Sequence, residues 1–123
     1  EEMTTLYGYS ADSVRVSNPG IPVFNHPECV ELACSAVKKA LGEEHLAKGA
    51  PTMGSESFRV LAKRYPSVIG HLGIENKELG MTGGLHNPRF EPCEDALPYG
   101  VAATVSYALE FFNREEDFSP WKA

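Results

Sequence analysis

A single histidine in a loop is the residue of this sequence best suited to carry out chemistry. His86 lies between a Gly-Gly pair and an Asn-Pro step, within a polar run over residues 76–96 that has no helical or strand periodicity. Loops of this length are uncommon in compact domains unless they are functional or disordered. A neutral imidazole there can bind a metal ion or transfer protons. Composition alone favours an exposed loop histidine, because no second ligand stands nearby at metal-site spacing.

One other set of side chains, and one other histidine, could bind a metal ion. His86, Cys93 and Asp95 could together form a small mononuclear metal site, since imidazole, thiolate and carboxylate all bind metals. Their irregular spacing in an aperiodic loop disfavours this arrangement. His71 lies within a segment that we expect to be a buried strand, so we interpret it as a structural histidine whose hydrogen bonds are satisfied.

The length, composition and net charge of the chain limit the class of protein it can belong to. The 123 residues fit one domain, and 42% hydrophobic with 23% charged residues is ordinary for a globular protein. A net charge of −6 argues against nucleic acid or an anionic membrane as the main partner. No apolar run reaches about 18 residues, so we expect no membrane span. The opening Glu1-Glu2-Met3 shows no basic segment before an apolar one, so we expect no signal peptide.

The three cysteines favour a reducing compartment. Cys29, Cys34 and Cys93 are an odd and sparse set, which does not form a disulfide framework. We therefore expect reduced thiols and a cytoplasmic location. Cys34 lies on an apolar helix face and is expected in the core.

Two segments carry strong helix signals, and the first covers residues 27–41. Pro27 suits a first helical turn, with Asn25 or His26 as its cap, and Gly42 ends the pattern. The apolar stripe consists of Val30, Ala33, Cys34, Val37 and Leu41. Such a stripe is typical of a helix that packs on a core.

The second strong helix covers residues 97–113. Asp95 is its expected cap, and Pro98 falls in its first turn. Its apolar stripe consists of Val101, Val105, Ala108, Leu109 and Phe112. Beyond Arg114 the chain is acidic and we expect it to fray, with Phe118 and Trp121 as residues that could dock.

The remaining elements are shorter. Residues 1–9 have the spacing of a helix end, residues 55–64 that of a short helix, and residues 13–17 and 67–74 that of strands. Helices and strands in this order predict an α/β fold. Two or three strands cannot build a sheet covered on both faces, so the pattern indicates part of a larger domain.

Four motifs in fixed order resemble the C-terminal part of peptidase family M20. They are Pro-Thr-Met-Gly-Ser-Glu-Ser-Phe at 51–58, the expected strand at 68–74, Leu-His-Asn-Pro-Arg-Phe at 85–90 and Glu-Asp-Ala-Leu-Pro-Tyr-Gly at 94–100. The resemblance runs from about residue 20 to residue 113. It is nearest to the amidohydrolase branch, which includes hippurate hydrolases and indole-acetyl-amino-acid hydrolases.

The resemblance implies a division of the chain. The family fold is a zinc-peptidase-like α/β catalytic domain with a smaller lid domain inserted in it. Residues 1–18 would be the last helix and strand of the lid, residues 19–114 the final section of the catalytic domain, and residues 115–123 a tail. The lid often mediates dimerisation in this family, so a homo-oligomer is expected.

The resemblance also implies a reaction and its residues. The family hydrolyses an amide bond of an N-acyl amino acid or short peptide with metal-bound water and a glutamate general base. His86 occupies the position of a metal-binding histidine, and Zn²⁺, Mn²⁺ and Ni²⁺ all suit imidazole. Asn87 and Arg89 are candidate contacts to a substrate carboxylate.

Departures from the family pattern limit what this chain can do. The family's Asp-x-Cys-Gly-His-Asp motif and its further metal-binding histidine do not occur in this sequence. The family's general base belongs to a Glu-Glu pair, but the pairs here, at 43–44 and 115–116, lie in a loop and in the tail rather than in a matching motif. Ser57 replaces the usual aspartate. Catalytic zinc needs about three protein ligands, so the chain alone is expected to bind no metal and to be inactive. The alternative is a non-catalytic binding or interaction domain. In either case we expect an uncovered strand edge or apolar face, which favours self-association.

Overall fold

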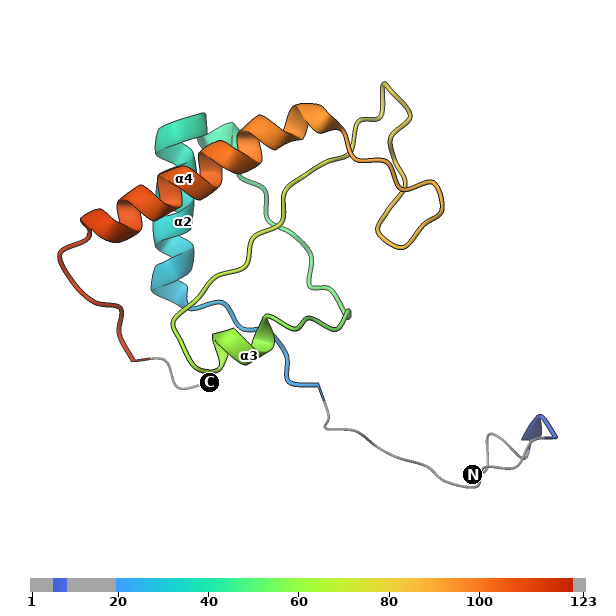
Figure 1. The fold of residues 1–123 in the computed structure, drawn as a ribbon, viewed down its shortest axis with the longest axis horizontal. Coiled ribbons are helices and arrows are strands. Elements are labelled where there is room, and N and C mark those ends of the chain that lie inside the picture. Colours follow the sequence, from blue (N-terminus) through green and yellow to red (C-terminus); the bar gives the residue numbers. More distant parts are fainter. Residues whose placement is uncertain (1–5, 9–19, 121–123) are drawn as a thin grey trace.

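Two crossing helices organise the part of the chain that the computed structural model describes, residues 6–8 and 20–120 (Figure 1). The elements in chain order are α2 (Pro27–Leu41), the 3-10 turn η1 (Glu43–His45), α3 (Arg59–Ala62), the 3-10 turn η2 (Glu94–Ala96) and α4 (Leu97–Asn113). Helices α2 and α4 pack on each other, and irregular segments join the rest. No helix in the described ranges is long and apolar enough to cross a bilayer.

Both long helices have the bounds predicted from the sequence. Pro27 opens α2, and Gly42 ends it at φ 103° while its N–H donates to the Lys38 carbonyl at 3.1 Å. His26, one of the two residues predicted to cap α2, occupies its N-cap position but makes no side-chain capping hydrogen bond, and the predicted Asp95 cap of α4 is wrong. Asp95 instead lies in η2, which leads directly into α4, so Ala96 takes the cap position.

The core between the helices is small and made of short side chains. Cys29 and Ala36 of α2 are fully buried there. The other buried apolar residues of the described chain, Ala62 of α3 and Cys93 before η2, lie outside these two helices. The prediction that Cys34 is a core residue is wrong, because it is only half-buried. Cys29 takes that place, where burial raises the pKa of its thiol.

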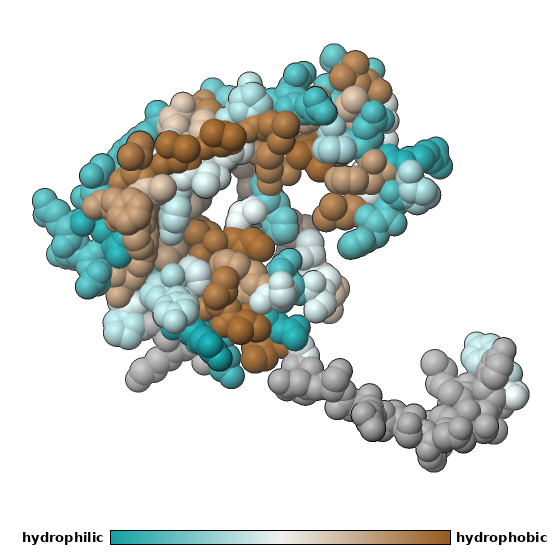
Figure 2. Space-filling view, viewed as in Figure 1, coloured by the Kyte–Doolittle hydropathy of each residue, from teal (hydrophilic) through white to brown (hydrophobic). Residues whose placement is uncertain are grey.

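The apolar stripe of α4 faces solvent. The exposed large residues on this helix are Leu97, Tyr99, Val101, Val105, Leu109 and Phe112, at 44% to 81% of their full exposure. A brown, hydrophobic band follows α4 in Figure 2. Helix α4 meets α2 through other residues, among them Glu110, whose carboxylate pairs with Lys39 at 2.8 Å. The expected uncovered apolar face is therefore confirmed, and it is a helix face.

The predicted strand at residues 67–74 is not a strand. Its backbone is held by the segment before α2: the His26 N–H donates to the Ser67 carbonyl at 2.9 Å. The Asn25 side chain donates to the Ile69 carbonyl and accepts from the Ile69 N–H, both at 2.9 Å. A side-chain amide thus occupies the place where a neighbouring strand would pair.

The α/β expectation is not confirmed in the described ranges, which contain helices and an isolated antiparallel bridge between Asn76 and Met81. The predicted strand at 13–17 lies outside them, as does most of the predicted helix end at 1–9. The helix predicted at 55–64 shortens to α3. Its first turn is replaced by a side-chain turn, because the Glu56 carboxylate accepts from the Phe58 N–H at 3.1 Å.

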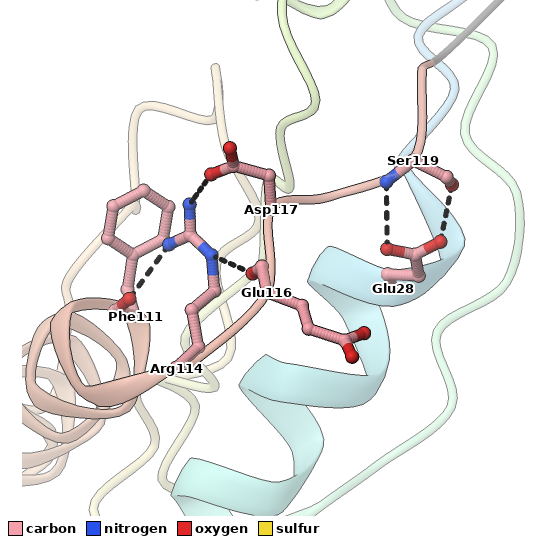
Figure 3. Close-up of polar contacts among 6 residues, drawn as sticks. All are labelled: Glu28, Phe111, Arg114, Glu116, Asp117 and Ser119. Carbon is pink, nitrogen blue, oxygen red and sulfur yellow. Dashed lines mark hydrogen bonds and ion pairs between the residues drawn. The ribbon is translucent and has the colours of Figure 1, made fainter.

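The C-terminal tail docks on the start of α2 (Figure 3). Both the N–H and the hydroxyl of Ser119 donate to the Glu28 carboxylate. The Ser119 carbonyl lies 3.0 Å from Nε2 of His26, which is only 2% exposed. We call Glu28, His26 and Ser119 the tail clasp. The prediction of a frayed tail is wrong up to residue 120.

An arginine organises the turn that leads to the tail clasp. The Arg114 guanidinium lies 3.7 Å from the centre of the Phe111 ring and 4.4 Å from that of Phe118. It also donates to the Phe111 and Glu116 carbonyls at 2.8 and 3.0 Å (Figure 3). The docking predicted for Phe118 is confirmed, while Trp121 lies outside the described residues.

The tail clasp predicts a response to acid. The Ser119 hydrogen bonds lower the pKa of the Glu28 carboxyl. A lowered pKa in the folded state means that the clasp is fully stabilised above the pKa of a free glutamate, about 4.3, and weakens as the pH falls through the lower folded value. We expect the Ser119 amide resonance to lose its hydrogen-bonded shift in that range. Glu28→Gln should flatten this titration, and an unchanged titration in that variant would exclude Glu28 as its source.

Candidate functional site

The loop that carries His86 projects beyond the start of α4 (Figure 1). Its base is closed by the Cys93 N–H, which donates to the Ile74 carbonyl at 2.9 Å. Inside it, Asn76 and Met81 exchange two backbone hydrogen bonds of 3.0 and 2.8 Å. The segment predicted to lack regular structure is therefore irregular but tied together by its own backbone.

Two successive turns surround His86. The Asn87 N–H donates to the Gly84 carbonyl at 3.2 Å, and the Phe90 N–H donates to the Asn87 carbonyl at 2.9 Å. His86 has a φ of 63°, the only positive value among non-glycine residues of the described chain. Left-handed backbone is uncommon for non-glycine residues, although asparagine, aspartate and histidine adopt it several-fold more often than the others, and it costs free energy that the surroundings must offset.

The three predicted site residues of this loop are all exposed. His86, Asn87 and Arg89 lie within four consecutive positions and face solvent. The Asn87 side chain has a structural task, because its Oδ1 accepts from the Arg89 N–H at 2.9 Å. The imidazole of His86 is accessible to an incoming group, and the Arg89 guanidinium stands on the same short loop.

The alternative site of His86, Cys93 and Asp95 does not form. Cys93 is buried, and its sulfur accepts from the Asn76 amide at 3.6 Å. Asp95 is exposed in η2. Among the described residues, no three His, Cys, Asp or Glu side chains converge in a way that could hold a metal ion. His86 fits a metal as one imidazole ligand, whereas these residues do not form a complete catalytic site.

The other histidines have different surroundings. His45 stacks on Tyr99 with 5.1 Å between ring centres, and His26 belongs to the tail clasp. His71 is exposed, which corrects its interpretation as a buried structural residue. It lies near the turn before α3, where the Phe58 N–H lowers the pKa of the Glu56 carboxyl and the charge of His71 adds a smaller effect in the same direction.

The clustered acidic residues do not supply a general base beside His86. Glu43 pairs with Lys38 at 2.7 Å at the end of α2, and residues 115–116 form a bend just after α4. Ser57, at the position where an aspartate was expected, donates to Glu56 at 3.3 Å. The tail clasp was missed by sequence reasoning because Glu28 and Ser119 are 91 positions apart and neither stands in a motif.

Comparisons with known proteins agree on one family. The profile of Peptidase family M20/M25/M40 matches residues 10–110. The chain is similar to IAA-amino acid hydrolase ILR1-like 2 of Arabidopsis thaliana, with 31% identity over 97 residues, 79% of this chain and 22% of the relative. It is also similar to the probable hydrolase sll0100 of Synechocystis, with 36% identity over 91 residues, 72% of this chain and 23% of that protein.

A third relative is named for a different activity. N-acetyldiaminopimelate deacetylase of Shouchella clausii is 29% identical over 85 residues, 69% of this chain and 21% of the relative. The chain thus spans about a fifth of the length of these curated relatives. No solved structure gives a significant match.

Proposed function

This chain belongs to peptidase family M20/M25/M40, and on that premise we propose that it supplies the C-terminal section of a metal-dependent amidohydrolase. The named relatives act on amino acid conjugates: an IAA-amino acid and an N-acetylated diamino acid. Both substrates join an acyl group to an amino acid through an amide. We therefore propose an N-acyl amino acid, or a short peptide, as the substrate class.

The conformation of His86 carries this proposal. Its left-handed backbone lies between two successive hydrogen-bonded turns, and His86 is exposed. Costly backbone conformations cluster at functional sites, where the surrounding structure maintains them. We propose His86 as one ligand of a Zn²⁺, Mn²⁺ or Ni²⁺ ion, because imidazole suits all three.

Substrate recognition would fall to the same loop. Arginine pairs with carboxylates through charge-assisted hydrogen bonds, often two at once. The exposed Arg89 is three positions from His86, so we propose that it contacts the substrate carboxylate. Asn87 has its Oδ1 engaged within the loop, so its contribution to the substrate would come through its amide nitrogen.

The rest of the site must come from outside the described residues, because these contain no group of three metal ligands. We propose that the chain alone is inactive. The solvent-facing apolar stripe of α4 supports this, since large exposed apolar patches mark surfaces that are covered in the working assembly. A homo-oligomer stays a prediction.

The lack of three converging metal ligands among the described residues and the exposed apolar stripe of α4 also favour a second candidate, a non-catalytic domain that binds another protein. The two candidates differ in chemistry. The 123-residue chain and the full-length product of its gene should be purified and assayed for hydrolysis of N-acyl amino acids, with metal content measured in parallel. We expect metal-dependent hydrolysis only from the full-length product, abolished by a chelator and restored by adding the metal.

Two results would contradict the amidohydrolase proposal. One is a full-length product without bound metal and without activity on any acyl amino acid, which would favour the binding domain. The other is full activity from the 123-residue chain alone, because one histidine ligand cannot support it.

A further inference from the structure

We propose that Gly83 and Asn87 are positioning residues that lock His86 in its left-handed conformation before any ligand arrives. The conformational part of this proposal stands on the loop geometry alone. The statement that the locked imidazole serves a metal ion rests on the proposed function.

Gly83 is required for space. A Cβ added there would lie 2.2 Å from the carbonyl oxygen of Arg89, 2.6 Å from its carbonyl carbon and 3.0 Å from the Phe90 nitrogen. These atoms belong to the backbone, so a side chain at Gly83 cannot be accommodated by a rotamer change. The returning part of the loop, residues 89–90, would have to move away from the part that precedes His86.

Gly84 provides a natural contrast. A Cβ added at Gly84 meets nothing within 4 Å. Neither of the two glycines has a positive φ, so neither is needed for its backbone conformation. For a substitution to alanine, the two glycines therefore differ in their space: the returning backbone lies against Gly83 and not against Gly84.

Asn87 holds the other side of His86. Its N–H reaches back to the Gly84 carbonyl at 3.2 Å, which closes a four-residue turn with His86 in the third position. Glycine or asparagine is usual at that position when φ is positive. Forward of His86, the Asn87 Oδ1 accepts from the Arg89 N–H at 2.9 Å, and the Asn87 carbonyl accepts from Phe90.

These contacts act together on one residue. Gly83 permits the close return of the chain at residues 89–90, and Asn87 ties that return to the turn that contains His86. The loop thereby offsets the cost of a left-handed histidine. The imidazole is presented from a single backbone conformation, which reduces the ordering that a ligand would otherwise impose on it.

The two glycines give a matched test. A positive φ brings a residue's own amide and α protons close together, so His86 should show a strong intraresidue NOE between them. We expect this NOE in the wild-type chain and in Gly84→Ala, and its loss in Gly83→Ala. Equal NOEs in the two alanine variants, or a weak NOE in the wild type, would overturn the proposal.

Asn87 gives a second test if Gly83→Ala fails to fold. Asn87→Asp keeps an oxygen that can accept from the Arg89 N–H, and Asn87→Ala does not. We expect a strong His86 NOE in the aspartate variant and a weakened one in the alanine variant. A strong NOE in both would exclude the Asn87 side chain as a positioning group.

A separate measurement addresses the metal. In the full-length product, titrated with Zn²⁺ alone, we expect Asn87→Ala to weaken affinity by about 10- to 100-fold, the usual cost of removing a group that orients a ligand. If the NOEs follow the expected pattern but His86→Ala leaves Zn²⁺ affinity unchanged, the metal role is wrong and the conformational lock stands. If the NOEs fail, the lock is wrong whatever the metal does.

Discussion

His86→Ala in the full-length product should lower kcat/KM for an N-acyl amino acid by about 100-fold or more, since loss of groups that only orient a ligand already costs about 10- to 100-fold. Metal content per polypeptide should fall in parallel. The folded state should be unaffected, because His86 is exposed and its side chain fills no core position. Steady-state kinetics and elemental analysis of the same preparation measure both effects.

His71→Ala is the matched control. His71 is also an exposed histidine outside regular structure, but its φ is not positive, and it lies near the turn before α3. We expect its activity and metal content to stay near those of the wild type. If His86→Ala behaves like His71→Ala, His86 is not a metal ligand. If both variants lose metal, the loss reflects a general effect of removing imidazoles.

The helices could be predicted almost to the residue because their limits depend on local chemistry. A proline is tolerated in the first turn, where its missing N–H has no helical partner. A glycine reaches the positive φ that ends a helix, as Gly42 does. These effects need no information from the rest of the fold.

Burial could not be predicted in the same way. The periodicity of α4 identifies which face is apolar, but not whether a partner covers it. In the structure, Val101 and Leu109 are 64% and 58% exposed, and the buried apolar residues are instead the small side chains Cys29, Ala36, Ala62 and Cys93. An apolar stripe indicates that a helix packs against a partner in the working protein. That partner can lie beyond the described residues.

The sequence could predict which residue lies at the candidate site, but not the backbone geometry around it. The motif around His86 identified the residue through its resemblance to a family. The requirement at Gly83 arises from the Arg89 carbonyl six positions away, and no local rule distinguishes Gly83 from Gly84. The same holds for the tail clasp, where the acidic composition of the tail indicated fraying although Ser119 is fixed by Glu28.

Asn25→Leu should destabilise the chain by about 1 kcal/mol, because a hydrogen bond contributes about 0.5–1.5 kcal/mol and water can replace part of the loss at these part-buried groups. The substitution keeps a similar volume but leaves both the N–H and the carbonyl of Ile69 without their partner. Those bonds are the main polar link between the start of α2 and residues 67–74. Urea unfolding, followed by the helical circular dichroism signal, measures the change.

Asn25→Asp separates the two bonds. An aspartate can still accept from the Ile69 N–H, but it cannot donate to the Ile69 carbonyl, so the loss of stability should be smaller than for leucine. A leucine variant as stable as the wild type would mean that residues 67–74 are held by side-chain packing. The segment has the β-branched composition of a strand, and Asn25 offers it the donor and acceptor pair that a neighbouring strand would provide. The fold thus satisfies one backbone position of a predicted strand with a side chain.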